Sequence, residues 1–353
     1  MRLLVAASGT GGHLFPALAV AEQIEGAQID WLGVPDRLET TLVPDRYSLR
    51  TVALEGFQGP PGPKTLRTLW RFARAIATVR GWLQAGQYDA VLTTGGYIAA
   101  PAIIGARLVG IPAVLHESNA IPGKVTRLLA PLCAKVAIGF EAAAAKLPPG
   151  KTVWTSTPVR QAFRGTQSLD LPIPAGVPLV VVAGGSQGAV AVNQLVRSAA
   201  PAWLDAGAWV VHLTGDRDPD AGGLQHPQYL AMPFYDNMAG LLQRADLAVS
   251  RAGAGTLTEL AITETPAILI PYPFAAEDHQ TFNAQAFVAG GAAELYAQAD
   301  LSADTLRAKV AALLQAPERL AAMRAGAAKL AIADSAERVA ALLPAAIAAR
   351  ATS

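Results

Sequence analysis

The segment from Asp246 to Glu259 combines an apolar stretch, two glycines and a carboxylate. The apolar residues end at Ser250, glycines follow at positions 253 and 255, and Glu259 stands at helical spacing after them. Glycine allows a tight backbone turn where a side chain would clash. A helix that begins after such a turn directs its N–H groups and the positive end of its dipole at an anion above the strand. We therefore expect this segment to form a cradle for the phosphate and ribose of a nucleotide.

A second glycine turn, Gly9-Thr-Gly-Gly-His13, follows the apolar stretch Leu3–Ala7. It is not a dinucleotide fingerprint, because Leu14 stands where G-x-G-x-x-G requires its third glycine. His13 follows the expected first strand at its carboxyl end, where open α/β sheets bind ligands. An imidazole accepts a proton near neutral pH, so His13 is a candidate general base for an attacking hydroxyl. The alternative is a histidine that only caps the next helix, which we expect to begin near Pro16.

The N-terminal pattern returns in the second half of the chain. Leu179-Val-Val-Val-Ala-Gly-Gly-Ser-Gln-Gly188 aligns on Leu3–Gly12 without a gap. Ser186 and Gln187 offer a hydroxyl and an amide to a phosphate; the alternative is a tight turn in which the serine only caps the helix. Two strand–turn–helix openings predict an α/β protein of two Rossmann-like, doubly wound domains facing across a cleft. Such a cleft suits a nucleotide donor on one side and an acceptor on the other.

Composition also indicates where the domains meet. Residues 156–176 are rich in Pro, Gly, Ser and Thr, which is typical of a linker. We expect an N-terminal domain of residues 1–155, completed by a C-terminal helix at 335–353, and a second domain of residues 177–334. Short apolar runs predict further strands at 89–94, 112–116, 209–213 and 267–271.

Charge and cysteine content exclude several classes of protein. The 353 residues include 28 basic and 27 acidic side chains, a net charge of +1 that provides no basic field for nucleic acid. The single cysteine, Cys133, excludes an internal disulfide and a cysteine zinc cluster. Asp216-Arg-Asp218 matches a pattern that holds divalent cations, but no further ligands follow it, so we expect a solvated turn and no metal cofactor. No uninterrupted apolar run reaches the ~18 residues that span a membrane.

The stretch from Gly56 to Tyr88 contains no acidic residue and has a helical pattern. One face of the predicted helix carries basic residues with tryptophans at its margins: Lys64, Arg67, Trp70, Arg71, Arg74 and Trp82. The opposite face is apolar. This pattern fits an ordinary amphipathic helix with a solvated basic face, or one that lies on an anionic membrane surface.

Several blocks of the sequence, taken in order, resemble glycosyltransferase family 28. They are Gly9–Val20, Gly95–Tyr97, Leu115–Asn119, Pro158–Arg160, Gly184–Ala189, Thr256–Glu259 and Asp278–Ala284. Bacterial enzymes of this family transfer N-acetylglucosamine (GlcNAc) from UDP-GlcNAc to lipid I, which gives lipid II for peptidoglycan. The resemblance implies the two-domain GT-B fold and inversion at the anomeric carbon, with UDP-GlcNAc on the C-terminal domain.

The resemblance also implies which residues bind the donor. The backbone near Tyr235 would meet the uracil and Glu259 the ribose. The full donor set is Thr10, Gly11, Gly12, Asn119, Arg160, Ser186, Gln187, Tyr235, Ala254, Gly255, Thr256, Leu257, Thr258, Glu259 and Gln280.

For the acceptor, lipid I, the resemblance implies a site on the N-terminal domain. Its residues are Gly11, Gly12, His13, Gly95, Gly96, Tyr97 and Asn119, with His13 matching the family's proposed base. The diphosphate would leave without a metal, stabilised by backbone N–H groups and helix dipoles. The family docks peripherally on the cytoplasmic face of the bacterial inner membrane, which favours the membrane interpretation of the basic helix.

Other functions stay open at this point. A related transferase that glycosylates diacylglycerol and a sugar-nucleotide 2-epimerase share the fold. A module that only binds nucleotides would need the same turns. An NAD-dependent oxidoreductase fits worst, because the first turn lacks the fingerprint and no ribose-binding acid follows it at the usual distance.

Overall fold

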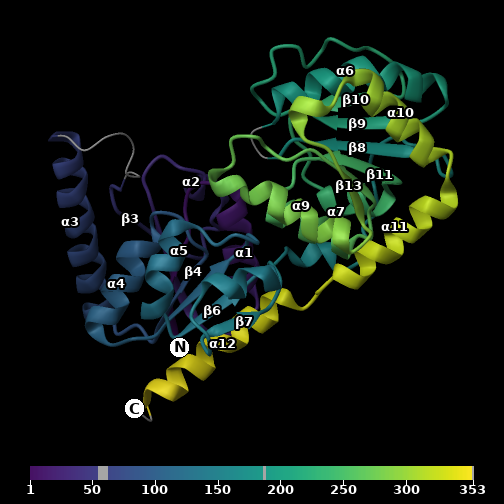
Figure 1. Ribbon diagram of the computed structural model, residues 1–353. Helices are drawn as coiled ribbons and strands as arrows, with labels where there is room; N and C mark the ends of the chain where they lie inside the picture. Colours follow the sequence, from purple (N-terminus) through teal and green to yellow (C-terminus); the bar gives the residue numbers. More distant parts are fainter. Residues whose placement is uncertain (55–62, 186–187, 352–353) are drawn as a thin grey trace. The chain divides into compact units, whose positions relative to one another are not determined.

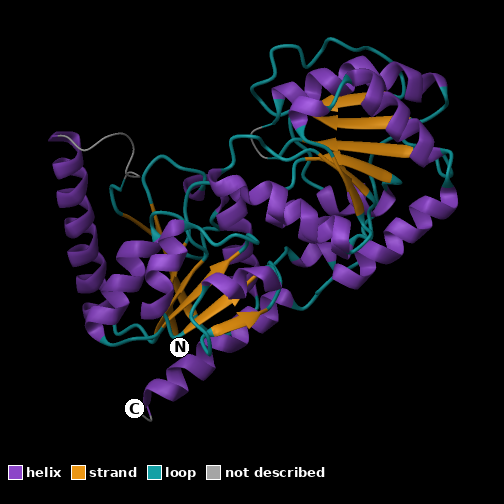
Figure 2. Ribbon diagram, viewed as in Figure 1, coloured by secondary structure: helices purple, strands orange, loops and turns teal. Residues whose placement is uncertain are grey.

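The computed structural model describes residues 1–54, 63–185 and 188–351, and of residues 63–65 only the backbone. The chain forms two compact units, Met1–Arg160 with Asp334–Ser353, and Gln161–Ala333 (Figure 1). Each unit is built on a parallel sheet that helices cover, as Figure 2 shows. The predicted α/β fold with two doubly wound domains is confirmed.

The sheet of the first unit has the strand order β3-β2-β1-β4-β5-β6-β7, and its pairings are parallel. The strands are β1 (Arg2–Ala6), β2 (Gln28–Gly33), β3 (Ser48–Thr51), β4 (Ala90–Thr93), β5 (Ala113–Glu117), β6 (Lys135–Ile138) and β7 (Thr152–Trp154). The order reverses between β1 and β4, where Leu3 pairs with Ala90. Ligands of open α/β sheets bind at the carboxyl ends of the strands beside such a reversal.

Helices cover both faces of this first sheet. They are α1 (Gly11–Glu22), α2 (Glu39–Leu42), α3 (Pro63–Ala85), α4 (Ala99–Val109), α5 (Lys124–Leu129) and α12 (Ser335–Ala351), with 3-10 turns η1 (Ala130–Leu132) and η2 (Glu141–Lys146). Val339 and Leu343 of α12 are fully buried in the same cluster as Leu3. Val79 of α3 and Ile103 of α4 fill a second cluster. A fully buried side chain of this size contributes about 1.5–3 kcal/mol, so α12 stabilises the first unit although it follows the second in sequence.

The sheet of the second unit repeats this pattern with the order β10-β9-β8-β11-β12-β13. Its strands are β8 (Leu179–Ala183), β9 (Trp209–Leu213), β10 (Tyr229–Met232), β11 (Leu247–Ser250), β12 (Ala267–Leu269) and β13 (Ala293–Leu295). Its helices are α6 (Val190–Asp205), α7 (Met238–Arg244), α8 (Ala254–Ile262), α9 (His279–Ala289), α10 (Ala303–Leu314) and α11 (Pro317–Leu330), with η3 (Gln161–Phe163), η4 (Ala276–Asp278) and η5 (Gln298–Asp300). The order reverses between β8 and β11, as it does between β1 and β4.

The predicted linker, residues 156–176, is not a separate segment. The boundary between the units lies at Arg160–Gln161, and the residues after it pack on the second unit. The N–H of Gln167 donates to Gln243 Oε1 at 2.9 Å, and Asn237 Nδ2 donates to the Ser168 carbonyl at 2.7 Å. Arg244 donates to the Pro174 carbonyl at 3.1 Å. These hydrogen bonds to α7 and the loop before it hold a stretch whose composition alone is typical of a free connection.

Helix α1 begins earlier than the sequence indicated. α1 begins at Gly11 rather than near Pro16, because the Thr10 carbonyl accepts the N–H groups of His13 and Leu14. α8 begins at Ala254, directly after Gly253. In both helices, glycine is well suited to the position where a tight turn becomes a helix.

Candidate active site

His13 lies in the first turn of α1 and reaches the turn that follows β4. Its Nδ1 lies 2.7 Å from the Thr94 carbonyl oxygen, and Thr94 Oγ1 donates to the His13 carbonyl at 2.8 Å. The ring lies against Gly95 and Gly96, whose φ angles are +95° and +74°. A Cβ atom would lie 3.4 Å from the ring at Gly95 and 3.6 Å from it at Gly96. Glycine at both positions therefore provides the positive-φ backbone conformation, while a Cβ at either would make only an ordinary contact with the imidazole.

These contacts determine the tautomer of His13. A carbonyl oxygen only accepts hydrogen bonds, so Nδ1 carries the proton that it donates to Thr94. Nε2 then carries the lone pair and can accept a proton, as a general base requires. The N-cap of α1 is Thr10, and the His13 ring bonds to the neighbouring turn, so the interpretation of His13 as a helix cap is wrong.

The loop after β5 is organised by Glu117, which sequence reasoning did not single out. Its carboxylate accepts the Asn119 N–H at 3.0 Å, the Gly123 N–H at 3.1 Å and the Thr126 hydroxyl at 2.6 Å. It also accepts Asn119 Nδ2 at 3.1 Å, which fixes the side-chain amide of this predicted substrate-binding residue. The sequence feature that could have identified Glu117 is a glutamate at the carboxyl end of a predicted buried strand.

The remaining predicted residues of the first unit also follow strands of its sheet. Tyr97 comes after β4 and is half exposed. The Arg160 guanidinium lies 4.9 Å from the centre of the Phe15 ring on α1, a cation–π contact that holds it beside the helix of His13. Thr10 and Gly12 are exposed at the start of α1, while Gly11 is buried. This edge therefore gathers the predicted acceptor residues around His13.

In the second unit, the predicted phosphate turn connects β11 to α8. Gly253 is the N-cap, with extended backbone and no side-chain cap. Helix N–H groups that lack a cap are available to an anion, and the helix dipole favours one there. Glu259 follows on α8 and is half-buried. Gln280 of α9 secures the turn, because its Oε1 accepts the N–H of Ala252 at 3.2 Å and that of Tyr272 at 2.9 Å.

The two units match the two domains of one family. The N-terminal domain of glycosyltransferase family 28 matches residues 3–138, and the C-terminal domain of that family matches residues 179–339. The chain belongs to glycosyltransferase family 28.

Similar proteins cover nearly the whole length of this family 28 chain. It is 63% identical over 342 residues to the UDP-N-acetylglucosamine–N-acetylmuramyl-(pentapeptide) pyrophosphoryl-undecaprenol N-acetylglucosamine transferase of Rippkaea orientalis, which spans 97% of both chains. It is 60% identical to the transferase of the same name from Synechocystis, over 98% of both chains. The crystal structure of Acinetobacter baumannii MurG has a TM-score of 0.77 and 28% identity, and covers 98% of this chain and 99% of that one.

Two residues of α8 that were predicted to bind the donor, Leu257 and Thr258, are buried in this family 28 protein. The Leu257 side chain is fully buried, and its N–H donates to the Gly253 carbonyl at 3.0 Å inside the helix. Neither group is left for a phosphate. Thr258 is also buried, and its hydroxyl donates to the Ala254 carbonyl at 3.0 Å. Donor contacts of the α8 start are therefore limited to the first turn, Ala254 to Thr256.

The expectation of a solvated turn at Asp216–Asp218 holds for Asp216 but is wrong for Asp218. Asp218 is buried and accepts Arg197 at 2.5 Å and Asn193 Nδ2 at 2.7 Å. Among the residues that the structure describes, no group of three His, Cys, Asp or Glu side chains is arranged to hold a metal ion.

Asn193 continues this network to a buried histidine. Its Oδ1 lies 3.0 Å from His212 Nε2, and its Nδ2 donates to the Thr214 carbonyl at 2.8 Å. Burial lowers the pKa of His212 to about 4, so this imidazole is neutral at physiological pH. The Thr214 carbonyl that Asn193 binds also lies close to the loop at Gly188. A Cβ at Gly188 would lie 2.3 Å from the Thr214 oxygen, so only glycine fits there. Ser186 and Gln187, the predicted phosphate ligands before Gly188, lie outside the described residues.

The sequence analysis did not single out Arg251, whose side chain supports the glycine turn of the second unit. It is buried, and its guanidinium donates to the Ile270 and Pro271 carbonyls at 3.0 and 2.9 Å and to Gln298 at 2.6 Å. Tyr235 is also engaged: its hydroxyl bonds to the Asp170 carboxylate, and burial together with this bond raises its pKa to about 12. The Tyr235 hydroxyl is therefore already bonded, and the predicted uracil contact remains one of the Tyr235 backbone.

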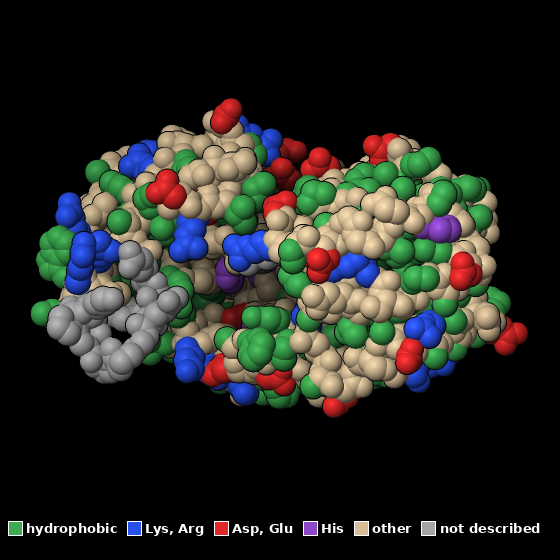
Figure 3. Space-filling model, turned by 90° about the horizontal axis from the view of Figure 1, so that it is seen from above, with side chains coloured by type: hydrophobic (Ala, Val, Ile, Leu, Met, Phe, Trp, Pro, Cys, Tyr) green, Lys and Arg blue, Asp and Glu red, His purple; other side chains and the backbone are tan. Residues whose placement is uncertain are grey.

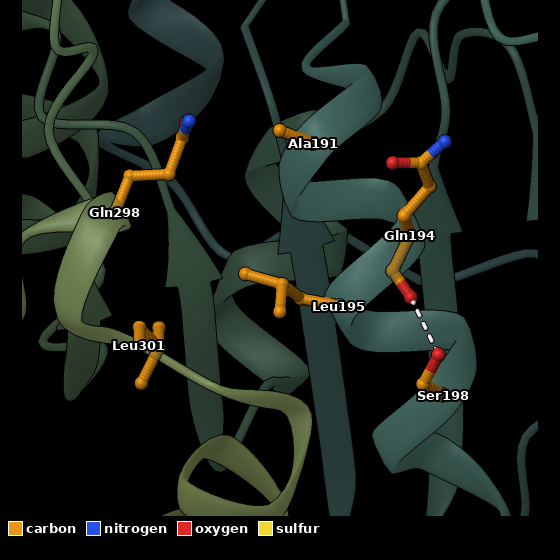
Figure 4. Close-up of a pocket in the computed structure, with 6 residues that line it drawn as sticks. All are labelled: Ala191, Gln194, Leu195, Ser198, Gln298 and Leu301. Atoms are coloured by element: carbon orange, nitrogen blue, oxygen red, sulfur yellow. Dashed lines mark hydrogen bonds between the residues drawn. The ribbon is translucent and has the colours of Figure 1, made fainter.

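The second unit also has a cavity of about 320 Å³, and Gln298, the partner of Arg251, is one of the residues that line it. Figure 4 shows its lining by α6 on one side and by Gln298 and Leu301 on the other. The side chains that line it are uncharged, and Ser198 donates back to the Gln194 carbonyl of its own helix at 3.0 Å. Its chemistry does not match a diphosphate.

Proposed function

We propose that this family 28 protein transfers GlcNAc from UDP-GlcNAc to the 4-hydroxyl of the N-acetylmuramic acid of lipid I, giving lipid II. The observation that carries the proposal is the 63% identity over 97% of both chains to a transferase named for this reaction. The position and tautomer of His13 support it chemically, because the reaction needs one base at the acceptor hydroxyl.

The proposed reaction is a single displacement with inversion. His13 Nε2 takes the proton of the acceptor 4-hydroxyl as that oxygen attacks C1 of the donor sugar. The bond from C1 to the UDP oxygen breaks on the opposite face, and its electron pair leaves with UDP. A β-linked product, UDP and a protonated imidazole result, and the imidazole then returns its proton to water.

The donor is proposed to bind the second unit. The N–H groups at Ala254–Thr256 and the dipole of α8 would stabilise the charge that develops on the departing diphosphate. Glu259 would accept the ribose hydroxyls, and the backbone of Tyr235 the uracil. Gln280 would contribute its amide nitrogen, since its oxygen is bound to the backbone. Ser186, Gln187, Asn119 and Arg160 complete the proposed donor set.

The acceptor is proposed to bind the first unit without a metal ion. Its pyrophosphate would meet the N–H groups of the Thr10–Gly12 turn, since helix starts bind anions. Gly95, Gly96, Tyr97 and Asn119 would contact the sugar or the pyrophosphate beside His13. Neutralisation of the leaving diphosphate by N–H groups and dipoles makes metal-independent transfer the expected result.

The membrane proposal rests on α3, and its occupant is an anionic lipid surface on the cytoplasmic face of the inner membrane. Leu66 and Trp70 are 72% and 59% exposed, and Arg67 and Arg74 are exposed on the same helix. Figure 3 shows basic beside hydrophobic side chains at this end of the first unit. Such a mixture suits peripheral binding to anionic lipid. No helix of the described part is long and apolar enough to cross a bilayer.

The sequence-based description of this helix needs one correction. Trp82 is half-buried rather than exposed: it packs against the core, and the Arg50 guanidinium lies 5.4 Å from its ring centre. Arg71 is half-buried, and the Lys64 side chain lies outside the described residues.

The decisive experiment measures UDP release from UDP-GlcNAc with a short-chain lipid I analogue, in the presence of EDTA. Release that requires the analogue and survives EDTA supports the metal-independent transferase. Release without an acceptor contradicts it in favour of an epimerase or a hydrolase. Release with diacylglycerol but not with the analogue would show a different acceptor, and no release with either would leave only nucleotide binding.

A further inference from the structure

Glu39, at the start of α2, is a buried carboxylate at the ligand edge of the first sheet. It is fully buried, and its Oε1 accepts the Ser8 hydroxyl at 2.5 Å and the Val34 N–H at 2.7 Å. Its Oε2 accepts the Gly9 N–H at 3.2 Å. Ser8 and Gly9 follow β1, and Val34 follows β2, so one side chain connects the ends of two adjacent strands.

The surrounding backbone accommodates this side chain at close range. A Cβ at Gly33 would lie 2.6 Å from Glu39 Cγ and 2.9 Å from Oε1, so the carboxylate passes where only glycine leaves room. Within the described part of the chain, no basic side chain forms an ion pair with Glu39. A buried charge is costly unless hydrogen bonds satisfy it, and here three donors at two strand ends do so.

The Gly9 turn that Glu39 holds leads directly to His13. Gly9 has a φ of +101°, and the next residue, Thr10, is the N-cap whose carbonyl accepts the His13 N–H at 3.0 Å. A shift of Gly9 is therefore transmitted to the backbone of His13. Thr94 holds the ring from the other side at Nδ1. The direction of Nε2 depends on both attachments.

Glu39 also determines which N–H groups of the turn are left for a ligand. It occupies the Gly9 N–H, so an anion meets the turn only from Thr10 onward. A carboxylate beside an anion site repels the anion, and burial does not remove this repulsion, so the charge of Glu39 cannot favour binding there. Its contribution is therefore to geometry.

We propose that Glu39 is a positioning residue: its carboxylate fixes the Ser8–Thr10 turn and thereby orients His13 for proton transfer. The role of His13 as base rests on the proposed function, whereas the orientation of its ring does not. Two measurements, one of turnover and one of the imidazole, therefore test the proposal separately.

The test variant is Glu39→Gln, which keeps the shape but places an amide NH2 where an oxygen accepted a backbone N–H. The matched control is Asp30→Asn, since Asp30 is an equally buried carboxylate on β2, bonded to Arg2 and Tyr88. Both variants lose stability. Only Glu39→Gln is expected to lower kcat, by about 10- to 100-fold, because small misplacements of a reacting group have effects of this size. The KM for UDP-GlcNAc is expected to stay constant.

The second readout is nitrogen NMR of the His13 imidazole, assigned with His13→Gln. The native protein and Asp30→Asn are expected to show the tautomer with a proton on Nδ1, and Glu39→Gln a mixture of both tautomers. Ser8→Ala, which removes one of the three bonds, is expected to have a smaller effect of the same kind and serves if Glu39→Gln does not fold. An unchanged tautomer in either variant overturns the proposal, as does unchanged kcat. A native protein without transfer activity but with the tautomer shift would contradict only the proposed function.

Discussion

The glycine turns β1–α1 and β11–α8 have the same strand–turn–helix form but are held by different side chains. In the first unit, carboxylates secure the loops by accepting hydrogen bonds: Glu39 takes the Gly9 N–H, and Glu117 takes those of Asn119 and Gly123. In the second unit, an arginine and two amides secure them. Arg251 donates to the Ile270 and Pro271 carbonyls and Asn193 to that of Thr214, while Gln280 Oε1 accepts the N–H groups of Ala252 and Tyr272. The backbone groups left for a ligand differ accordingly.

This difference matches the function proposed for each unit. Where Arg251 and Asn193 occupy carbonyls, the N–H groups at the start of α8 remain directed at an anion, which suits a leaving diphosphate. Where Glu39 occupies an N–H, the turn is fixed for the residue that follows it, which suits a base. Two strand–turn–helix connections, β1–α1 and β11–α8, thus acquire different proposed roles from a few buried side chains.

The largest effect is expected at His13. His13→Gln is expected to lower kcat about 10²- to 10⁴-fold, because no other imidazole replaces Nε2 at the acceptor hydroxyl. The Kd for UDP, measured by calorimetry, is expected to stay unchanged. His226→Gln, a substitution outside both turns, is the control and retains kcat. Full turnover in folded His13→Gln would reject its role as base and remove the functional contrast between the units.

A change at Arg251 tests the other half of the comparison. Arg251→Met leaves the Ile270 and Pro271 carbonyls buried without their donor, so we expect a loss of about 3 kcal/mol in the free energy of unfolding. Hydrogen exchange by mass spectrometry should place the loss in residues 161–333. Arg307→Met, which breaks only an exposed pair with Asp304, is expected to cost under about 1 kcal/mol. Equal losses in the two variants would show that Arg251 does not support the turn.

Glu259 tests whether the second turn holds the donor. Glu259→Gln is expected to weaken UDP binding about 10- to 100-fold, which corresponds to the ~1.5–3 kcal/mol of hydrogen bonds to a charged acceptor. Glu264→Gln, at an exposed position just beyond α8, is the control for charge alone. Calorimetry with UDP measures both. Equal affinities would remove Glu259 from the ribose site.

The smallest expected effect is a dependence of stability on pH to which both units contribute. Burial lowers the pKa of His116 in the first unit and of His212 in the second to about 4, from 6.5. The unfolded chain therefore binds more protons between pH 6.5 and 4, so stability falls as the pH is lowered through this window. Each histidine is expected to contribute a loss of about 1.4 kcal/mol between pH 7.5 and 5.5.

Denaturation of the native protein and of His212→Asn at both pH values checks this expectation. The variant should lose the contribution of His212 and keep that of His116, so its dependence on pH should be shallower. An equally steep dependence would show that His212 is not the group that titrates.

The sequence by itself determined the two parallel sheets and the place of His13. Short apolar runs ending in glycine predicted the strands, because buried parallel strands need apolar side chains on both faces and a tight turn into each helix. Since ligands bind at the carboxyl ends of such strands, His13 and Glu259 were recognisable from their positions alone. The helix from Pro63 to Ala85 and the packing of a C-terminal helix on the first unit were also predictable.

Only the tertiary structure decided which side chains hold these sites. Glu39 is 31 positions from Ser8, and Arg251 is 47 from Gln298, so no local pattern connects them. The burial of Leu257 in the core removes from the donor set a residue that the resemblance had placed there. The burial of Asp218 depended on Arg197, which α6 brings from another part of the chain. Partners of buried polar groups are set by three-dimensional proximity, and sequence spacing carries no information about it.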